Sequence, residues 1–245
     1  PAGAGAAGHE TLPAATPASQ GLHPEVVMQQ PAVVHLMRHG QVHNPEGVLY
    51  GRLPGFGLSE LGHEMAARLA EYWDGTPLTH LRCSPLQRAR ETLAPTAELF
   101  PQLDVVIDER VTEAANAFEG RVFGADNKAL RDVRMIRHVL NPLRPSWGEP
   151  YREIAARMRA AMGDAAAAAG PGGQALVVSH QLPIEMARRD AEGRPLVHDP
   201  RRRRCTLVSV TFFTFRDGFV TAVDYAEPAQ DLLPPKRGRR FRVGT

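Results

Sequence analysis

Val33-Val34-His35-Leu36-Met37-Arg38-His39-Gly40 is the stretch of sequence that decides the fold, because an apolar run ends abruptly in a cation, an imidazole and a glycine. A run of this length that begins with β-branched residues predicts a strand buried on both faces, and Gly40 allows a sharp turn at its carboxyl end. In an open α/β sheet, ligands bind at the carboxyl ends of the strands. Arg38 can direct two N–H donors at phosphate oxygens while the His39 imidazole faces phosphorus, so this strand end favours phosphoryl chemistry.

The composition indicates a globular protein and gives no sign of a nucleic-acid or membrane partner. The chain of 245 residues, 43% of them hydrophobic, fits one large α/β domain or two small ones. The net charge is only +2, and lysine occurs only at Lys128 and Lys236, so we expect no nucleic-acid partner. No stretch approaches about eighteen uninterrupted apolar residues, and the amino terminus lacks the pattern of a secretory leader. We therefore expect a soluble, cytoplasmic protein that does not bind a membrane, and its oligomeric state stays open.

The two cysteines, Cys83 and Cys205, lie in apolar, strand-like settings without the His or Cys neighbours that a metal site requires. We expect buried thiols in a reducing compartment, and neither a metal nor a cofactor.

The two ends of the chain differ from its middle. Residues 1–30 are rich in Ala, Gly and Pro and predict a disordered leader, whereas residues 31–227 predict the folded domain. The basic residues of 228–245 could form a nucleic-acid or acidic-surface patch, but a disordered tail is the better prediction, because the basic run is short, terminal and almost free of aromatic residues.

Strands and helices alternate through the domain. Beyond the first strand, strands are expected at 80–83 and 103–107, a further buried strand at 175–180, and a hairpin at 205–215 and 219–225. Helices are expected from an N-cap at Ser59 to Gly75, at 86–100 with a kink or break at Pro95, at 128–140 and at 151–169. This order predicts an α/β fold: a three-layer α/β/α sandwich whose mostly parallel central sheet carries an antiparallel edge hairpin.

Two of the buried strands end in histidine, at Arg38-His39 and at Ser179-His180. If both strands are central and parallel, their carboxyl ends bring the two imidazoles together. A third strand ends at Cys83-Ser84 and delivers Arg88 in the first turn of the next helix. Three strand ends that supply one cluster of His and Arg predict a phosphate pocket.

With these motifs in order, the chain resembles the histidine phosphatase superfamily, the phosphoglycerate mutase-like fold, from about Ala32 to Tyr225. The motifs that carry the resemblance are Leu36-Met37-Arg38-His39-Gly40-Gln41, Leu58-Ser59-Glu60-Leu61-Gly62, Ser84-Pro85-Leu86-Gln87-Arg88-Ala89-Arg90-Glu91-Thr92, Glu113 ahead of Phe118-Glu119-Gly120, Trp147-Gly148-Glu149-Pro150 and Val177-Val178-Ser179-His180.

The resemblance implies a catalytic role for five residues. His39 would be the nucleophile that carries a phosphohistidine, with a neutral imidazole that donates one N–H to a nearby backbone carbonyl. Arg38, Arg88 and His180 would surround the equatorial phosphate oxygens and supply the positive charge that a metal supplies elsewhere. Glu113 would protonate the leaving oxygen and then activate water. Spacing alone does not choose among the neighbouring carboxylates, which are Asp108, Glu109, Glu113 and Glu119.

The resemblance also implies a substrate-binding set of Asn44, Gly51, Arg52 and Gln181. The backbone N–H groups of Gly51 and Gln181 would complete the phosphate cradle, the latter near a helix start that favours anions. Asn44 stands one residue closer to Arg38-His39 than in most relatives and could equally be a turn residue before Pro45. Gln181 stands where most relatives have Gly, so its side chain would lie at the pocket wall and select the substrate.

We expect a phosphomonoester hydrolase that acts on a small phosphorylated metabolite. Ala114-Ala115-Asn116-Ala117 does not resemble the acidic-aromatic-glycine signature of a mutase, but a phosphoglycerate-type mutase and a non-catalytic module that binds phosphorylated ligands remain alternatives. The cap over the pocket should come from about 120–146, whose basic side chains could meet an anionic substrate or form a solvated helix face. The run Arg201-Arg202-Arg203-Arg204 could steer anions, but an exposed turn is the favoured interpretation.

Overall fold

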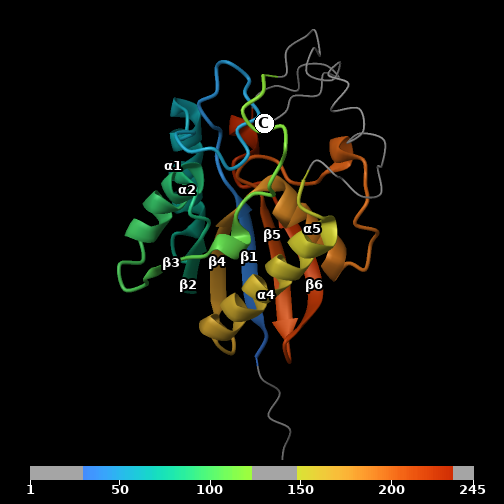
Figure 1. Cartoon of the computed structure of the whole chain (residues 1–245). Helices are drawn as coiled ribbons and strands as arrows, with labels where there is room; N and C mark the ends of the chain where they lie inside the picture. The colour runs from blue at the N-terminus through green and yellow to red at the C-terminus, as the bar shows by residue number, and fades with distance from the viewer. Residues whose placement is uncertain (1–29, 123–147, 234–245) are drawn as a thin grey trace, which may run out of the picture.

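The computed structural model describes residues 30–122 and 148–233, and this part of the chain contains a six-stranded sheet. Its strands are β1 (Ala32–Arg38), β2 (Leu78–Cys83), β3 (Val105–Ile107), β4 (Gln174–Ser179), β5 (Val210–Arg216) and β6 (Phe219–Ala226). In space they follow the order β3-β2-β4-β1-β5-β6 (Figure 1). The first four strands in this order run parallel to one another, and β5 runs antiparallel to both of its neighbours, β1 and β6. This arrangement confirms the predicted sheet.

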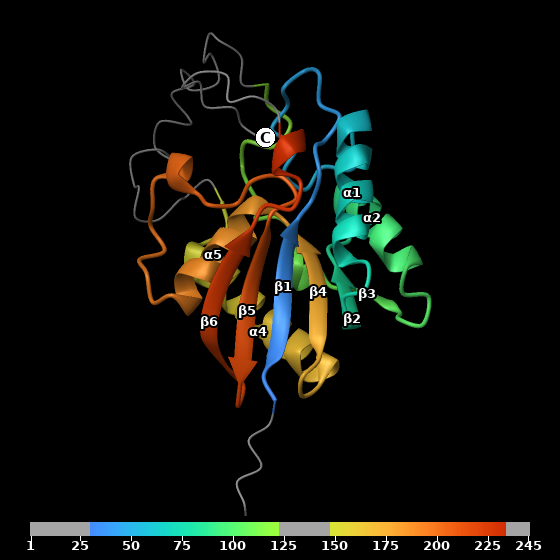
Figure 2. The same cartoon turned by 180° about the vertical axis from the view of Figure 1, so that it is seen from behind.

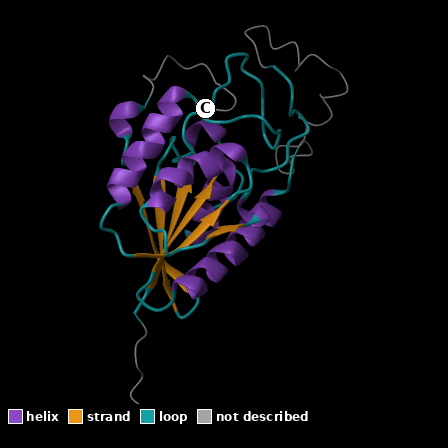
Figure 3. Ribbon diagram, turned by 90° about the vertical axis from the view of Figure 1, so that its left-hand side faces the viewer, coloured by secondary structure: helices purple, strands orange, loops and turns teal. Residues whose placement is uncertain are grey.

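Helices cover both faces of the sheet and complete the predicted three layers. Helices α1 (Glu60–Trp73) and α2 (Gln87–Glu98) lie on one face, and α4 (Tyr151–Ala169) and α5 (Gln181–Ala191) lie on the other (Figures 1, 2 and 3). Successive side chains of a strand point to opposite faces, so Leu36 packs in the core under α4 and α5 while Met37 packs in the core under α1 and α2. Strand β1 is therefore buried on both sides, as its apolar run predicted.

Helix α1 begins where the sequence predicted. The Ser59 side chain accepts a hydrogen bond from the backbone N–H of Gly62 at 3.1 Å, which satisfies one of the free donors of the first turn. Met65, Leu69 and Trp73 form its buried face. In α2 the predicted kink or break at Pro95 is wrong in one respect: the helix continues from Gln87 to Glu98 without interruption. Buried Leu93 and Thr96 on either side of Pro95 hold this turn against the sheet.

The hairpin begins later than predicted, because β5 starts at Val210 and not at Cys205. The residues between them turn instead: Val208 adopts a φ of 51°, and the N–H of Ser209 donates to the carbonyl of Thr206 at 3.3 Å. The physical reason is that the Cys205 carbonyl accepts hydrogen bonds from Arg38 and from Gln181, which draws this segment away from a strand ladder.

The remaining segments are short. In the described part of the chain, short 3₁₀ turns lie at η1 (Glu109–Val111), η3 (Pro200–Arg202) and η4 (Gln230–Leu232). Residues 228–233, which the prediction gave to the tail, pack on the domain: Ala229 is buried, and Leu232 and Leu233 contact the core under α1 and α2. The predicted leader, the helix at 128–140, nearly all of the cap at 120–146 and the end of the tail lie outside the described residues. Within the described ranges, no helix has the length and apolar character that crossing a membrane requires.

Candidate active site

The two histidine-terminated strands lie side by side and run in the same direction. Strands β1 and β4 pair Arg38 with Ser179, so His39 and His180 leave the sheet at the same edge. Their ring centroids are 5.1 Å apart, at an interplanar angle of 55°. The topology therefore brings together two imidazoles that are far apart in sequence.

His39 is held in a state suited to nucleophilic attack. Its side chain is buried, and Nδ1 lies 2.8 Å from the carbonyl oxygen of Gly40, which can only accept, so Nδ1 carries the proton and Nε2 the lone pair. Burial, with a smaller contribution from Arg88 and Arg38, holds the pKa of His39 well below 6.5. The imidazole is therefore neutral at pH 7.

The backbone at His39 is fixed from helix α2. The N–H of Gly40 donates to the hydroxyl of Thr92 at 3.0 Å, and that hydroxyl donates to the carbonyl of Arg88 at 2.7 Å. A Cβ on Gly40 would lie 2.9 Å from the carbonyl oxygen of Gly62, so only glycine allows this close packing against α1. One helix thus positions both the end of β1 and the guanidinium of Arg88.

His180 lies fully buried beside His39. Its Nε2 is 2.8 Å from the hydroxyl of Ser84, the residue that follows β2, and its Nδ1 has no hydrogen-bond partner among the described residues. Burial, followed by the charges of Arg88 and other cations, holds the pKa of His180 well below 6.5. The role of Ser84 in orienting this ring was not predicted, although Ser84 belongs to a motif that the sequence singled out.

Two buried guanidinium groups stand next to the imidazoles. Arg38 donates from Nη1 to the carbonyl of Cys205 at 2.8 Å, and Arg88 donates from Nη2 to the carbonyl of Gly51 at 2.7 Å. Each keeps a buried Nε that has no partner within the described part of the chain, and no ion pair is found there for either. Arg88 also lies over the ring of Tyr50, 4.7 Å from its centroid, a neighbour that the sequence did not indicate. Two desolvated cations with free donors make a site that an anion would stabilise.

The structure separates the four candidate carboxylates. Asp108 is engaged by Arg82 and Arg110, and Glu109 is exposed. Glu113 and Glu119 both contribute negative charge at Arg88, and Glu113 also at Tyr50. The half-buried carboxylate of Glu113 accepts a hydrogen bond from the N–H of Ala114 at 2.8 Å through Oε1. Of the four candidate carboxylates, Glu113 and Glu119 are thus the two whose charge acts on Arg88.

The segment that carries Glu113 is held by a second group of charges. Arg52 donates from Nε to the Glu113 carbonyl at 2.6 Å and from Nη2 to the Glu149 carboxylate at 2.9 Å. Arg157 holds the other Glu149 oxygen at 2.6 Å and also donates to the carbonyl of Thr112 at 2.8 Å. Arg52, predicted to bind substrate, and Glu149 therefore both bear on the position of Glu113.

The other predicted binding residues have distinct surroundings. Both polar atoms of the Asn44 side chain bond the backbone of Val48, at 2.9 and 3.0 Å, as in a local turn. Gly51 has a φ of 40° and lies so close to the Glu119 side chain that a Cβ would overlap it. Gln181 donates to the Cys205 carbonyl at 3.3 Å. Their contacts with a substrate stay predictions, and among the described residues no cluster of His, Cys, Asp or Glu is arranged to hold a metal ion.

The two buried imidazoles predict a specific dependence of stability on pH. As the pH falls below 6.5, the unfolded chain binds protons that folded His39 and His180 do not, so the stability contribution present above pH 6.5 is lost progressively. Each of these two imidazoles accounts for on the order of 1 kcal/mol between pH 7.5 and 5.5. Urea unfolding at both pH values should give a loss for the wild type that exceeds the loss for His180→Asn by about that amount. Equal losses would contradict the neutral, buried state of His180.

The chain is similar to known proteins in both sequence and fold. Residues 34–228 match the family described as the histidine phosphatase superfamily (branch 1). The chain is 46% identical over 202 residues to the uncharacterized protein Rv0525 of Mycobacterium tuberculosis, an alignment that covers 82% of this chain and 99% of that protein. Among solved structures, YhfR of Bacillus stearothermophilus superposes with a TM-score of 0.66 at 23% identity, over 78% of this chain and 94% of YhfR. A mycobacterial glucosyl-3-phosphoglycerate phosphatase, Rv2419c, superposes with a TM-score of 0.62 at 23% identity, over 76% and 91% of the two chains.

Proposed function

The chain belongs to the histidine phosphatase superfamily, and from this premise we propose that it is a metal-independent phosphomonoester hydrolase that works through a phosphohistidine at His39. The observation that carries the proposal is the neutral, buried imidazole of His39 beside the guanidinium groups of Arg38 and Arg88. A neutral nitrogen with a free lone pair is a nucleophile, and the two cations supply the charge stabilisation that phosphoryl transfer requires.

The proposed reaction has two steps. In the first, Nε2 of His39 attacks phosphorus, a P–N bond forms, and the P–O bond to the leaving group breaks while Glu113 gives that oxygen a proton. In the second, Glu113 takes a proton from water, which attacks the phosphohistidine and releases phosphate. Arg38, Arg88 and His180 would bind the three equatorial oxygens, where charge is spread in the transition state. The substrate we propose is a small phosphorylated metabolite, whose transferred phosphate dianion matches the two positive charges of Arg38 and Arg88.

The test is phosphate release from a panel of small phosphomonoesters in the presence of EDTA. We expect turnover that EDTA leaves unchanged, and after rapid mixing with a ³²P-labelled ester and an alkaline quench we expect labelled protein whose label is lost in acid, as for a phosphohistidine. Complete inhibition by EDTA, or turnover without any labelled protein, would contradict the proposal. A mutase would instead interconvert phosphoglycerate isomers and depend on a bisphosphorylated primer.

A further inference from the structure

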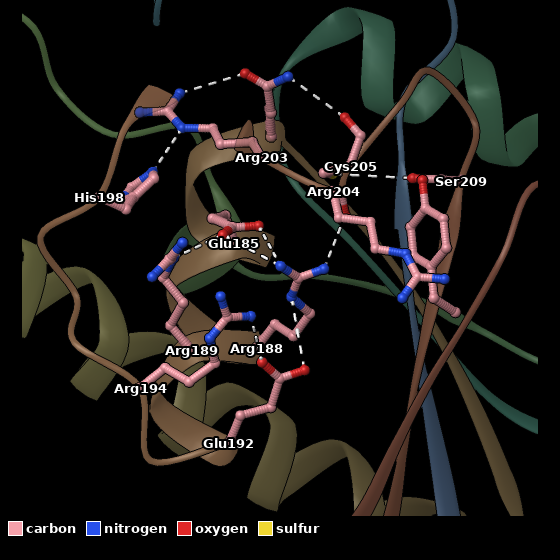
Figure 4. Close-up of polar contacts among 12 residues, drawn as sticks. Glu185, Arg188, Arg189, Glu192, Arg194, His198, Arg203, Arg204, Cys205 and Ser209 are labelled. Carbon is pink, nitrogen blue, oxygen red and sulfur yellow. Dashed lines mark hydrogen bonds and ion pairs between the residues drawn. The ribbon is translucent and has the colours of Figure 1, made fainter. Parts of the chain in front are cut away.

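The four arginines of Arg201–Arg204 have four different surroundings. The side chains of Arg201 and Arg202 are 76% and 85% exposed and lie near the carboxylate of Asp199, as the predicted exposed turn requires. Arg204 lies over the ring of Tyr225, 4.5 Å from its centroid. Arg203 instead turns inward, toward His198 and the beginning of α5 (Figure 4). The favoured interpretation of the run as an exposed turn is therefore wrong for Arg203.

Two neutral acceptors fix the guanidinium of Arg203. Its Nε donates to Nε2 of His198 at 2.9 Å, and its Nη1 donates to the side-chain oxygen of Gln181 at 3.3 Å. His198 can accept because its Nδ1 lies 2.8 Å from the carbonyl of Leu196 and carries the ring proton. Arg203 is thus oriented by its partners without being neutralised by them.

Arg203 makes no ion pair with any described residue, although its neighbours do. The buried carboxylate of Glu185 is occupied by Arg189 at 2.7 Å and by Arg188 at 3.2 Å (Figure 4). The Arg203 side chain is half-buried, and this burial lowers its pKa although Tyr151, Glu113 and Glu185 act in the opposite direction. A half-buried cation that forms no ion pair is only partly compensated, and an anion that reaches it binds favourably.

The position of Arg203 relates it to the phosphate cluster. Gln181 follows His180 directly, and its amide bridges the Arg203 guanidinium to the Cys205 carbonyl, which also accepts from Nη1 of Arg38. The negative charge of Glu113 acts on Arg203 as well. Arg203 is therefore linked to Arg38 through the Gln181 side chain and the Cys205 carbonyl.

We propose that Arg203 is a specificity-determining residue that binds a second anionic group of the substrate, a carboxylate or a second phosphate, while Arg38 and Arg88 hold the phosphoryl group that is transferred. This inference rests on the proposed function and assigns to its substrates an anionic group in addition to the phosphate that is transferred. Gln181 is the positioning residue, since it orients Arg203 and contacts the carbonyl that holds Arg38. A guanidinium oriented in advance suits this task, because little freedom is lost when it binds carboxylate or phosphate.

The experiment compares pairs of esters that differ only in the second anion: 3-phosphoglycerate with glycerol 3-phosphate, and fructose 1,6-bisphosphate with fructose 6-phosphate. We expect the wild type to prefer, in at least one pair, the ester that carries the second anion. The pair in which this preference appears shows whether the second anion is a carboxylate or a phosphate. In Arg203→Met, kcat/KM for that member should fall by roughly tenfold to a hundredfold, the value of a charge-assisted hydrogen bond, while kcat/KM for the counterpart that lacks the second anion changes by less than about threefold. Arg203→Lys should recover part of the preference, and Arg202→Met, the matched control, should leave it unchanged.

An equal loss on both members of a pair would overturn the proposal, because a merely structural role of Arg203 would affect every ester alike. A wild type without any preference would overturn it too. Calorimetric measurement of the affinities for the same four compounds separates a failure of the hydrolase proposal from a failure of the role proposed for Arg203. If no ester turns over, the hydrolase proposal fails, and tighter binding of the ester with the second anion, lost in Arg203→Met, would still support the role of Arg203. Equal affinities would then overturn that role.

Discussion

Replacement of His39 by alanine is expected to lower kcat/KM for every phosphomonoester by on the order of a thousandfold or more, because the variant loses the atom to which the phosphoryl group is transferred. The neighbouring imidazole is not expected to take over, because Nε2 of His180 already bonds the Ser84 hydroxyl at 2.8 Å. Steady-state phosphate release on the best ester of the panel measures the effect. The alkaline quench should find no labelled phosphoprotein in this variant.

Two further variants make this result specific. His39→Gln keeps most of the buried volume and should be as inactive as His39→Ala, whereas His63→Ala removes an exposed histidine on α1 and should retain full activity. Thermal unfolding of all three establishes that they are folded. If His39→Ala retained a tenth or more of the wild-type kcat/KM, another residue would be the nucleophile and the proposed mechanism would be wrong.

The sequence predicts well those parts of the fold that local physics decides. The apolar run that ends at Met37 has to be buried on both faces, which requires a central strand of a parallel sheet. Helix α4 is expected at 151–169 and lies there, since a helical apolar pattern follows Pro150 and Gly170 ends it with a φ of 78°. Ser59 caps α1 through a hydrogen bond to Gly62 that needs only neighbouring residues.

Contacts between distant residues decide what the sequence does not predict. Cys205 stands in an apolar pattern typical of a strand, but its carbonyl accepts a hydrogen bond from Arg38, which is 167 positions away in the chain. In the same way, a run of four arginines does not tell which one turns inward, because Gln181 and His198 select Arg203 through tertiary contacts. His39 and His180 could be paired in advance only because strand ends of a parallel sheet meet at one edge.

The second large effect is a loss of stability, which we expect from Glu185→Ala on the buried side of helix α5. Glu185 is fully buried and holds the buried guanidinium groups of Arg188 and Arg189 (Figure 4). Its removal leaves the buried Arg189 guanidinium without an ion-pair partner among the described residues and leaves Arg188 with Glu192 alone, at 3.8 Å, which costs about 3 to 5 kcal/mol in the free energy of unfolding. Urea unfolding at pH 7.5 measures the loss. As the matched control, Asp190→Ala removes the partner of Arg159 in an exposed pair and should cost less than about 1 kcal/mol.

The triple variant Glu185→Leu, Arg188→Met, Arg189→Met decides the cause of this loss. If unpaired charge destabilises Glu185→Ala, replacing all three groups by apolar side chains of similar size should restore most of the stability. The two arginines also donate to the carbonyls of Pro195 and Arg204, which lie on either side of Arg203 in the chain. The triple variant is therefore expected to regain stability but to lose discrimination between esters with and without a second anion. A triple variant as unstable as Glu185→Ala would show that the hydrogen bonds to these carbonyls, and not the buried charge, hold this part of the fold together.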